Sequence, residues 1–167
     1  DDLPSKSRDV LVDQINMKLA LLGSGGVGKT SIVNSFFQKA FPERYIPTIG
    51  SNINNKEFKL KDRNLHVKVS TWDVGGQRSF NPLNPAFYNN VDAALLVIDL
   101  TEPEKTLEEI KTEYLPKLFE HAQGCITFVI GNKLDLIKNK DSLSSVVKKN
   151  FNEEVPLIFT SAKTGQH

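Results

Sequence analysis

The stretch that decides the fold is GSGGVGKT, at residues 23–30. It follows an apolar run at 19–22 and precedes a helix-like run at 31–37, and this order of strand, glycine-rich loop and helix is typical of a phosphate-binding loop. Glycines let successive backbone N–H groups point at phosphate oxygens, and the positive end of the following helix dipole adds to the attraction. Lys29 is expected to reach the β- and γ-phosphates, and the Thr30 hydroxyl is expected to ligate Mg²⁺.

The composition is that of an ordinary globular domain. The 167 residues are 39% hydrophobic and 25% charged, which suits one soluble domain with a full core. A formal net charge of +1 gives no bulk electrostatic reason to expect a nucleic-acid partner. The lone Cys125 favours a reducing compartment, and no apolar run approaches the roughly 18 residues of a membrane-spanning helix. We therefore expect a cytoplasmic protein, and any peripheral association with a membrane would have to be through ends not contained in this sequence.

Strand-like and helix-like stretches alternate along most of the chain. β-branched and apolar runs predict strands at 14–22, 51–60, 65–72, 91–99, 125–131 and 155–160. Apolar residues at a spacing near 3.6, with Thr101 or Glu102 before Pro103 as the start signal, predict a helix over 103–121. Further helices are expected at 29–38 and 141–151.

The connections between these stretches define the fold class. Runs 51–60 and 65–72 are joined by only four residues and form a hairpin, while the other strands are separated by helices, which implies parallel pairing. The sequence predicts an α/β fold with a six-stranded, mostly parallel sheet, one antiparallel hairpin strand and helices on both faces. Residues 1–13 are expected to be an N-terminal tail or linker, and 14–167 one domain whose final helix is missing or truncated.

A second set of polar residues follows the hairpin. Asp73 stands where a nucleotide-bound Mg²⁺ needs a carboxylate. Gly76 can bring its backbone N–H close to a γ-phosphate because no side chain intervenes, and Gln77 has both a donor and an acceptor with which to orient a water. In the proline- and glycine-flanked segment 41–50, Thr48 can offer its hydroxyl to the metal and its N–H to the γ-phosphate.

Two further segments follow strand ends and point to guanine. The Asp135 carboxylate can accept two hydrogen bonds, and guanine alone among the common bases presents an N1–H and N2–H₂ pair on one edge. Lys133 can lay its aliphatic stem along the face of the base. After the last strand, the small Ala162 lets a backbone N–H approach the guanine carbonyl oxygen. Because ligands sit at strand carboxyl ends in open α/β sheets, NKLD at 132–135 predicts a guanine site there.

Together these segments resemble the Ras superfamily of small GTPases from about residue 14 to residue 166. The resemblance implies a P-loop NTPase G domain in which Gln77, Lys29 and Thr48 are catalytic. It also implies that Mg²⁺ is held by Thr30, Thr48 and Asp73.

The resemblance implies an extended nucleotide site as well. Phe41 matches the aromatic residue that packs edge-on against the base, and Tyr45 matches the tyrosine that covers the phosphates. The implied nucleotide-binding residues are Ser24, Gly25, Gly26, Val27, Gly28, Lys29, Thr30, Ser31, Phe41, Tyr45, Thr48, Gly76, Asn132, Lys133, Asp135, Leu136, Ser161, Ala162 and Lys163.

The subfamily motifs are mixed. YIPTIG at 45–50 looks Rab- or Ras-like. WDVGGQ, which begins at Trp72, looks like the Arf and heterotrimeric Gα form, because Gly75 stands where Ras and Rab proteins usually carry alanine. Trp72 and Phe87 match two of the three surface aromatics that Rab proteins use to bind effectors, but the third position is Ile53. The chain therefore combines Rab-like and Arf-like features.

The main functional prediction is a Mg²⁺-dependent GTPase switch that cycles between effector-binding and inactive states in signalling or membrane trafficking. GTP and GDP are its ligands. Intrinsic hydrolysis is expected to be slow, because Arg44 is predicted to be solvated rather than to supply a catalytic arginine in cis, and an activating protein is expected to stimulate it. Effector, exchange factor and activating protein are expected to bind through Ile46, Ile49, Trp72, Phe80 and Phe87.

Two alternatives stay open on the sequence alone. Pro82 and Pro85 would break any helix over 78–88 and could hold Gln77 away from the attacking water, which would give a GTP-binding interaction module with little or no hydrolysis. A P-loop ATPase or kinase is the other alternative, and it requires that the segment 132–135 does not bind the base.

Overall fold

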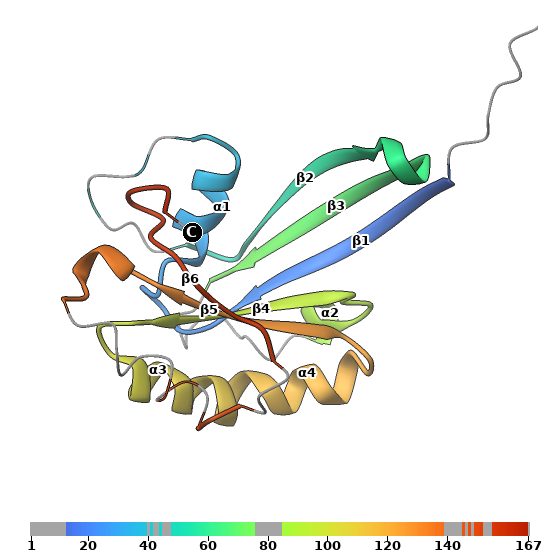
Figure 1. Ribbon diagram of the computed structural model, residues 1–167. Coiled ribbons are helices and arrows are strands. Elements are labelled where there is room, and N and C mark those ends of the chain that lie inside the picture. The colour runs from blue at the N-terminus through green and yellow to red at the C-terminus, as the bar shows by residue number, and fades with distance from the viewer. Residues whose placement is uncertain are drawn as a thin grey trace, which may run out of the picture.

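The computed structural model of the chain describes residues 13–39, 41, 44, 48–75, 85–138, 145, 147, 149–151 and 155–166. These residues form a central sheet with helices on both sides (Figure 1). The strands are β1 (Asp13–Leu22), β2 (Ser51–Leu60), β3 (Leu65–Val74), β4 (Ala93–Asp99), β5 (Ile126–Asn132) and β6 (Leu157–Phe159). The α-helices are α1 (Lys29–Phe36), α2 (Pro85–Tyr88), α3 (Pro103–Glu109) and α4 (Leu115–His121). Two 3₁₀ turns and one π turn are also present, namely η1 (Lys61–Arg63), η3 (Leu134–Leu136) and η2 (Ile110–Tyr114).

The strands form one sheet in the order β2-β3-β1-β4-β5-β6. β2 runs antiparallel to β3, and the other neighbouring pairs are parallel. This confirms the predicted mostly parallel sheet with one hairpin strand. β1 pairs with β3 over Asp13–Leu21 but with β4 only over Leu19–Leu22, so β1, β2 and β3 project beyond the rest of the sheet (Figure 1).

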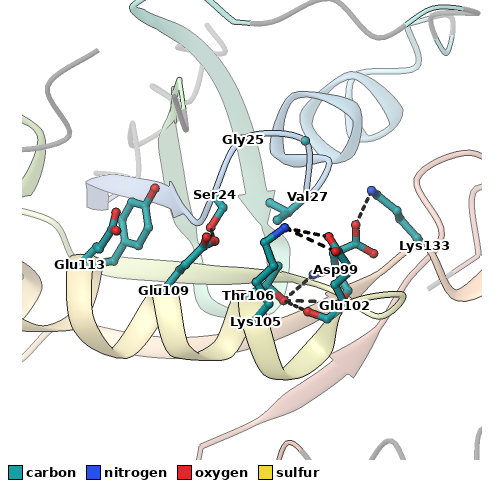
Figure 2. Close-up of a pocket in the computed structure, with 12 residues that line it drawn as sticks. Ser24, Gly25, Val27, Asp99, Glu102, Lys105, Thr106, Glu109, Glu113 and Lys133 are labelled. Carbon is teal, nitrogen blue, oxygen red and sulfur yellow. Dashed lines mark hydrogen bonds and ion pairs between the residues drawn. The ribbon is translucent and has the colours of Figure 1, made fainter. Parts of the chain in front are cut away.

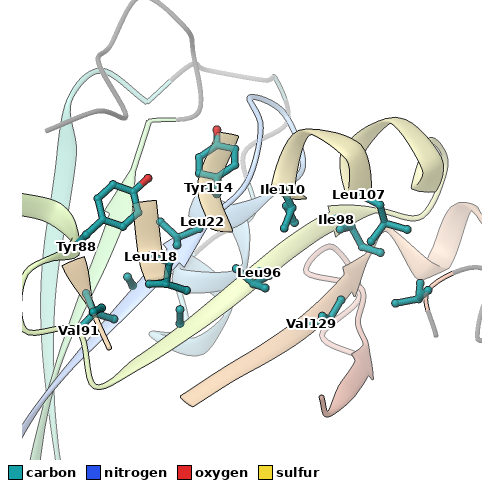
Figure 3. Close-up of a cluster of buried hydrophobic side chains, with 14 of the residues drawn as sticks. Leu22, Tyr88, Val91, Leu96, Ile98, Leu107, Ile110, Tyr114, Leu118 and Val129 are labelled. Carbon is teal, nitrogen blue, oxygen red and sulfur yellow. The ribbon is translucent and has the colours of Figure 1, made fainter. Parts of the chain in front are cut away.

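Apolar side chains at alternate positions of the central strands face opposite sides of the sheet. In β4, Leu96 and Ile98 pack in one buried cluster with Leu107 of α3, whereas Val97 packs in a second cluster with Val33 of α1. A strand that is buried on both faces produces this alternation, because successive side chains point to opposite faces. Figure 3 shows the larger cluster, with Leu107 and Ile110 from the helical run and Leu96, Ile98 and Val129 from the strands. Helices therefore cover both faces, as predicted.

The helix predicted over 103–121 is present as a continuous helical run, but a π turn interrupts it. α3 ends at Glu109, the π turn spans Ile110–Tyr114, and α4 begins at Leu115. Pro116, in the first turn of α4, has no N–H, and in a regular α-helix its ring would clash with the carbonyl four residues earlier. The wider π turn accommodates this proline without ending the helical run.

The expected end of the first helix was wrong. The helix expected over 29–38 ends at Phe36, and Gln38 adopts a left-handed φ of 56°. Prolines were also expected to break any helix over 78–88. Of that segment the structure describes only 85–88, where the single turn α2 begins at Pro85. Proline suits a first helical position because the N–H that it lacks would have no intrahelical partner there.

Other predictions lie outside the described residues. They include the tail at 1–13, of which only Asp13 is described, and most of the helix expected at 141–151. Among the helices that the structure does describe, none is both long and apolar enough to span a membrane.

Candidate functional site

The loops that follow β1, β5 and β6 converge on one side chain at the end of β5. The amide of Asn132 is buried, and its Nδ2 donates to the Val27 carbonyl oxygen at 2.9 Å. Its Oδ1 accepts from the Ala162 N–H at 3.1 Å and from the Thr160 hydroxyl at 3.3 Å. One buried amide therefore joins the glycine-rich loop at 23–30 to the segment after β6.

Gly28 is the glycine that this junction requires. Its φ is +99°, a conformation that side chains disfavour, and a Cβ at this position would lie 2.2 Å from Asn132 Nδ2. A larger residue would displace the amide that joins the loops. α1 begins directly afterwards at Lys29, so the N–H groups of its first turn, which lack intrahelical partners, lie at the loop.

The side chain of Lys29 is held inside the loop. Its Nζ donates to the carbonyl oxygens of Gly23 at 2.6 Å and Ser24 at 2.9 Å, and the residue is only 6% exposed. Burial lowers the pKa of Lys29 to about 8, although the nearby Asp73 carboxylate acts to raise it. The ammonium is therefore poorly solvated, and an anion bound in the loop would stabilise its charged form.

Three oxygen-bearing side chains meet between α1 and the end of β3. The Thr30 hydroxyl donates to Asp73 Oδ2 at 2.5 Å, and the Thr48 hydroxyl lies 2.6 Å from that of Thr30. Asp73 Oδ1 is buried and has no hydrogen-bond partner within the described residues. Burial raises the pKa of Asp73, against the opposing effects of the Thr30 bond and of Lys29. A carboxylate oxygen without a partner beside two hydroxyls fits a hard divalent cation, which takes oxygen ligands.

The residues predicted to bind a base also lie together. Ser161 is buried, and its hydroxyl donates to Asp135 Oδ1 at 2.6 Å. Asp135 itself is exposed, as are Leu136 and Lys163. The Asp135 carboxylate is therefore held at Oδ1 while the residue remains exposed.

A cavity of about 360 Å³ lies between the glycine-rich loop and α3 (Figure 2). Ser24 and Val27 line it from the loop, and Lys133 lines it from the end of β5. Two carboxylates that the sequence analysis missed hold Ser24 and Lys133, because Glu109 accepts from the Ser24 hydroxyl and Asp99 pairs with Lys133. Asp99 carries a signal that could have been used, since it is a polar residue at the carboxyl end of a central strand. Nothing local in the sequence links Glu109 to the loop.

Part of the predicted site lies outside the described residues, namely Tyr45, Gly76 and Gln77. Phe41 is described and is 45% exposed. The remaining predicted residues occupy the glycine-rich loop, the start of α1, the end of β3 with Thr48, and the segments after β5 and β6.

Comparison with known proteins adds the family. The family model described as "Ras family" matches residues 18–167. The chain belongs to the Ras family. It is thus a small GTPase, a GTP-binding molecular switch that hydrolyses GTP to GDP and acts in membrane trafficking or signalling.

Similar proteins from three organisms are two Ras-related Rab proteins and one GTP-binding protein. The chain is 34% identical to Ras-related protein Rab-7b of Mus musculus over 152 residues, which cover 90% of the chain and 75% of that protein. It is 34% identical to GTP-binding protein ypt5 of Schizosaccharomyces pombe over 156 residues, which cover 92% and 72%. It is also 34% identical to Ras-related protein Rab7 of Drosophila melanogaster over 156 residues, which cover 89% and 73%. These relatives support the Rab-like prediction and give the Arf-like features no specific support.

Two of the residues predicted to bind effectors, Trp72 and Phe87, lie on one surface with Ile53. The rings of Trp72 and Phe87 lie edge to face with centroids 6.3 Å apart. Ile53 of β2 stands opposite Trp72 in the β2–β3 register and is half exposed. Lys18 Nζ lies 4.1 Å from the centroid of the Trp72 ring. We call Ile53, Trp72 and Phe87 the Trp72 surface; Ile49, which was also predicted to contact partners, is 75% exposed.

Proposed function

We propose that the phosphates of GDP or GTP bind at the 23–30 loop of this GTPase and that guanine binds at 132–135. The observation that carries the proposal is Asn132, whose buried amide bonds both to the loop and to Ala162. A nucleotide across these loops would meet backbone N–H groups and Lys29 at its phosphates and the Asp135 carboxylate at its base. That carboxylate can accept from the N1–H and N2–H₂ groups of guanine, whereas adenine offers no such pair.

We also infer a Mg²⁺ site at Thr30, Thr48 and Asp73. Its support is the Asp73 oxygen without a partner and the two hydroxyls beside it. A metal bound there would supply positive charge against the β- and γ-phosphate oxygens. Thr48 belongs to the segment before β2, so its hydroxyl would link that segment to the nucleotide site.

Hydrolysis at such a site would depend on positioning and electrostatics rather than on covalent chemistry. Lys29 and the loop N–H groups would stabilise negative charge on the phosphate oxygens, and Gln77 would orient the attacking water. The role of Gln77 rests on the family resemblance. Arg44 is exposed, which supports slow intrinsic hydrolysis and an arginine supplied by an activating protein. No observation favours the alternative of an interaction module without hydrolysis.

Regulators and effectors are proposed to bind at the Trp72 surface together with Ile49. Ile46 and Phe80 were predicted to contribute as well, and they lie outside the described residues. We further propose that the protein is cytoplasmic and associates with membranes peripherally, in keeping with its Rab-type relatives.

Nucleotide identity and release test this proposal. Chromatography of the nucleotide released from denatured protein should yield GDP or GTP, and GTP but not ATP should displace fluorescent GDP. Removal of Mg²⁺ by EDTA should accelerate GDP release from the wild type but change release from Asp73→Asn little. Equal displacement by ATP would contradict the guanine site, and equal EDTA effects in both proteins would contradict the metal site.

Timed GTP hydrolysis tests the catalytic part separately. Gln77→Leu should retain nucleotide and lose hydrolysis, while the wild type hydrolyses slowly. Equal rates in the two proteins would show that Gln77 does not orient the water.

A further inference from the structure

Asp99 is a buried carboxylate at the carboxyl end of β4, next to the proposed base site. It is paired in register with Asn132 of β5, and its side chain is only 8% exposed. Its Oδ1 accepts from the Thr101 N–H at 2.9 Å and from the Thr101 hydroxyl at 2.6 Å, while its Oδ2 accepts from Lys133 Nζ. Burial alone would raise the pKa of Asp99, but the bonds from Lys133 and Thr101 prevail and lower it, so the side chain is an anion at neutral pH.

The backbone on both sides of Lys133 is fixed as well. Lys133 has a left-handed φ of 68°, which is uncommon for a residue with a side chain. The preceding Asn132 is held by its buried amide, and the N–H of the following Leu134 donates to the Thr160 carbonyl oxygen at 3.0 Å. With the backbone fixed at one end and the ammonium held by Asp99 at the other, the aliphatic stem between them has little freedom.

We propose that Asp99 is a positioning residue, which holds Lys133 so that its stem forms a fixed wall for the base. In Figure 2 the Lys133 ammonium is directed at Asp99 at the edge of the cavity beside the glycine-rich loop. A free lysine side chain samples many rotamers, and ordering it on binding opposes binding. Because Asp99 orders the stem before the nucleotide binds, less side-chain entropy is lost on binding, and the nucleotide is released more slowly. This inference rests on the proposed placement of guanine at 132–135.

The negative charge of Asp99 and its positioning of Lys133 predict opposite effects of an Asp99 substitution on the rate of nucleotide release. A nucleotide is a polyanion, so removal of a nearby negative charge should by itself slow nucleotide release. Loss of the anchor for Lys133 should instead speed release. Glu102 provides a matched control, because it lines the same cavity but is exposed and, among the residues that the structure describes, its carboxylate pairs only with the exposed Lys105, at 3.2 Å.

The test is the release rate of fluorescent GDP from the full chain in Mg²⁺. Asp99→Asn keeps an acceptor oxygen for Thr101 and removes the ion pair with Lys133, and release should become about tenfold to a hundredfold faster, as for loss of a charge-assisted hydrogen bond. Glu102→Gln should leave release unchanged or slightly slower. In a Lys133→Met background, which keeps most of the stem, Asp99→Asn should change release less than twofold.

Asp99→Glu keeps the charge but shifts the carboxylate by one methylene, and it too should speed release. This variant also covers the case in which the asparagine variant does not fold. Unchanged or slower release from Asp99→Asn, or an equal effect in the Lys133→Met background, would overturn the proposal. If the wild type retains GDP while Asp99→Asn behaves like Glu102→Gln, this inference alone fails. If the wild type binds no guanine nucleotide, the proposed function fails with it.

Discussion

Replacement of Gly75 by alanine tests how closely the end of β3 approaches the backbone before β2. Gly75 N–H donates to the Gly50 carbonyl oxygen at 2.8 Å. A Cβ on Gly75 would lie 2.5 Å from the Thr48 carbonyl oxygen and 3.2 Å from that of Gly50. Ordinary carbon–oxygen contacts begin at about 3.3 Å, so the overlap with Thr48 is about 0.8 Å. Both neighbours are backbone atoms, which cannot rotate away, and the chain around Thr48 must therefore move.

Such a movement has a predictable size and a predictable second effect. Overpacking of this kind costs about 1–3 kcal/mol of unfolding free energy. A shift of the Thr48 backbone also draws the Thr48 hydroxyl away from Thr30, which lies 2.6 Å from it now. We therefore expect Gly75→Ala to lower stability by about 2 kcal/mol and to weaken the dependence of GDP retention on Mg²⁺. This is expected although alanine is usual at this position in Ras and Rab proteins.

Urea unfolding and Mg²⁺-dependent release of fluorescent GDP measure the two effects. Gly124→Ala is the control, because Gly124 has a φ of +82° and open space around its Cβ position. Backbone strain should lower the unfolding free energy of that variant by about 1 kcal/mol, and its GDP release should depend on Mg²⁺ as in the wild type. If Gly75→Ala were as stable as the wild type and released GDP with the same Mg²⁺ dependence, the steric reasoning would be refuted.

Two further predictions concern side chains of the glycine-rich loop. Because burial lowers the pKa of Lys29 from 10.5 to about 8, the unfolded chain binds this proton more tightly than the folded chain. The nucleotide-free protein should therefore gain up to about 3 kcal/mol of stability as the pH rises from 8 to 10.5. Lys29→Met should remove this gain. If urea unfolding gave the wild type and Lys29→Met the same dependence of stability on pH, the prediction would be contradicted. Ser24→Ala and Glu109→Ala should each speed GDP release by about fivefold, because each removes the hydrogen bond between Ser24 and Glu109. The double variant should release GDP no faster than either single variant, because the same bond is lost in all three. Glu108→Ala, at the exposed neighbouring position, should leave release unchanged, and additive effects of the first two variants would show that they act separately.

The overall topology was predictable because its signals are local. The glycine-rich loop marks the junction of β1 and α1 whatever the rest of the chain does. The short link at 61–64 allows only antiparallel pairing of its two strands, and the long helical run at 103–121 requires β4 and β5 to be parallel. The position of residues 132–135 at the carboxyl end of a strand was likewise predictable, because they follow a clear strand in the sequence.

Contacts between segments that lie far apart in the sequence could not be predicted, because no local sequence pattern indicates them. The bond between Ser24 and Glu109 joins residues 85 positions apart, and each is an ordinary polar residue on its own. The close approach of Gly75 to Thr48 depends on how two loops meet, which neither loop encodes alone. The π turn before Pro116 arises because packing holds the helical run on both sides of a proline that an α-helix does not accommodate.

The short pairing of β1 with β4 has a mechanical consequence. β1 is joined to β3 along Asp13–Leu21 but to β4 only along Leu19–Leu22, so the sheet resists shear less between β1 and β4 than between β1 and β3. The proposed metal residues lie on the β1–β3 side, and the proposed base residues follow β5 and β6 on the other. A bound nucleotide would therefore contact both halves of the sheet. A force that separates the two halves would then act on the contacts with the nucleotide as well. The lifetime of the folded protein under tension should then depend on nucleotide affinity as well as on strand pairing.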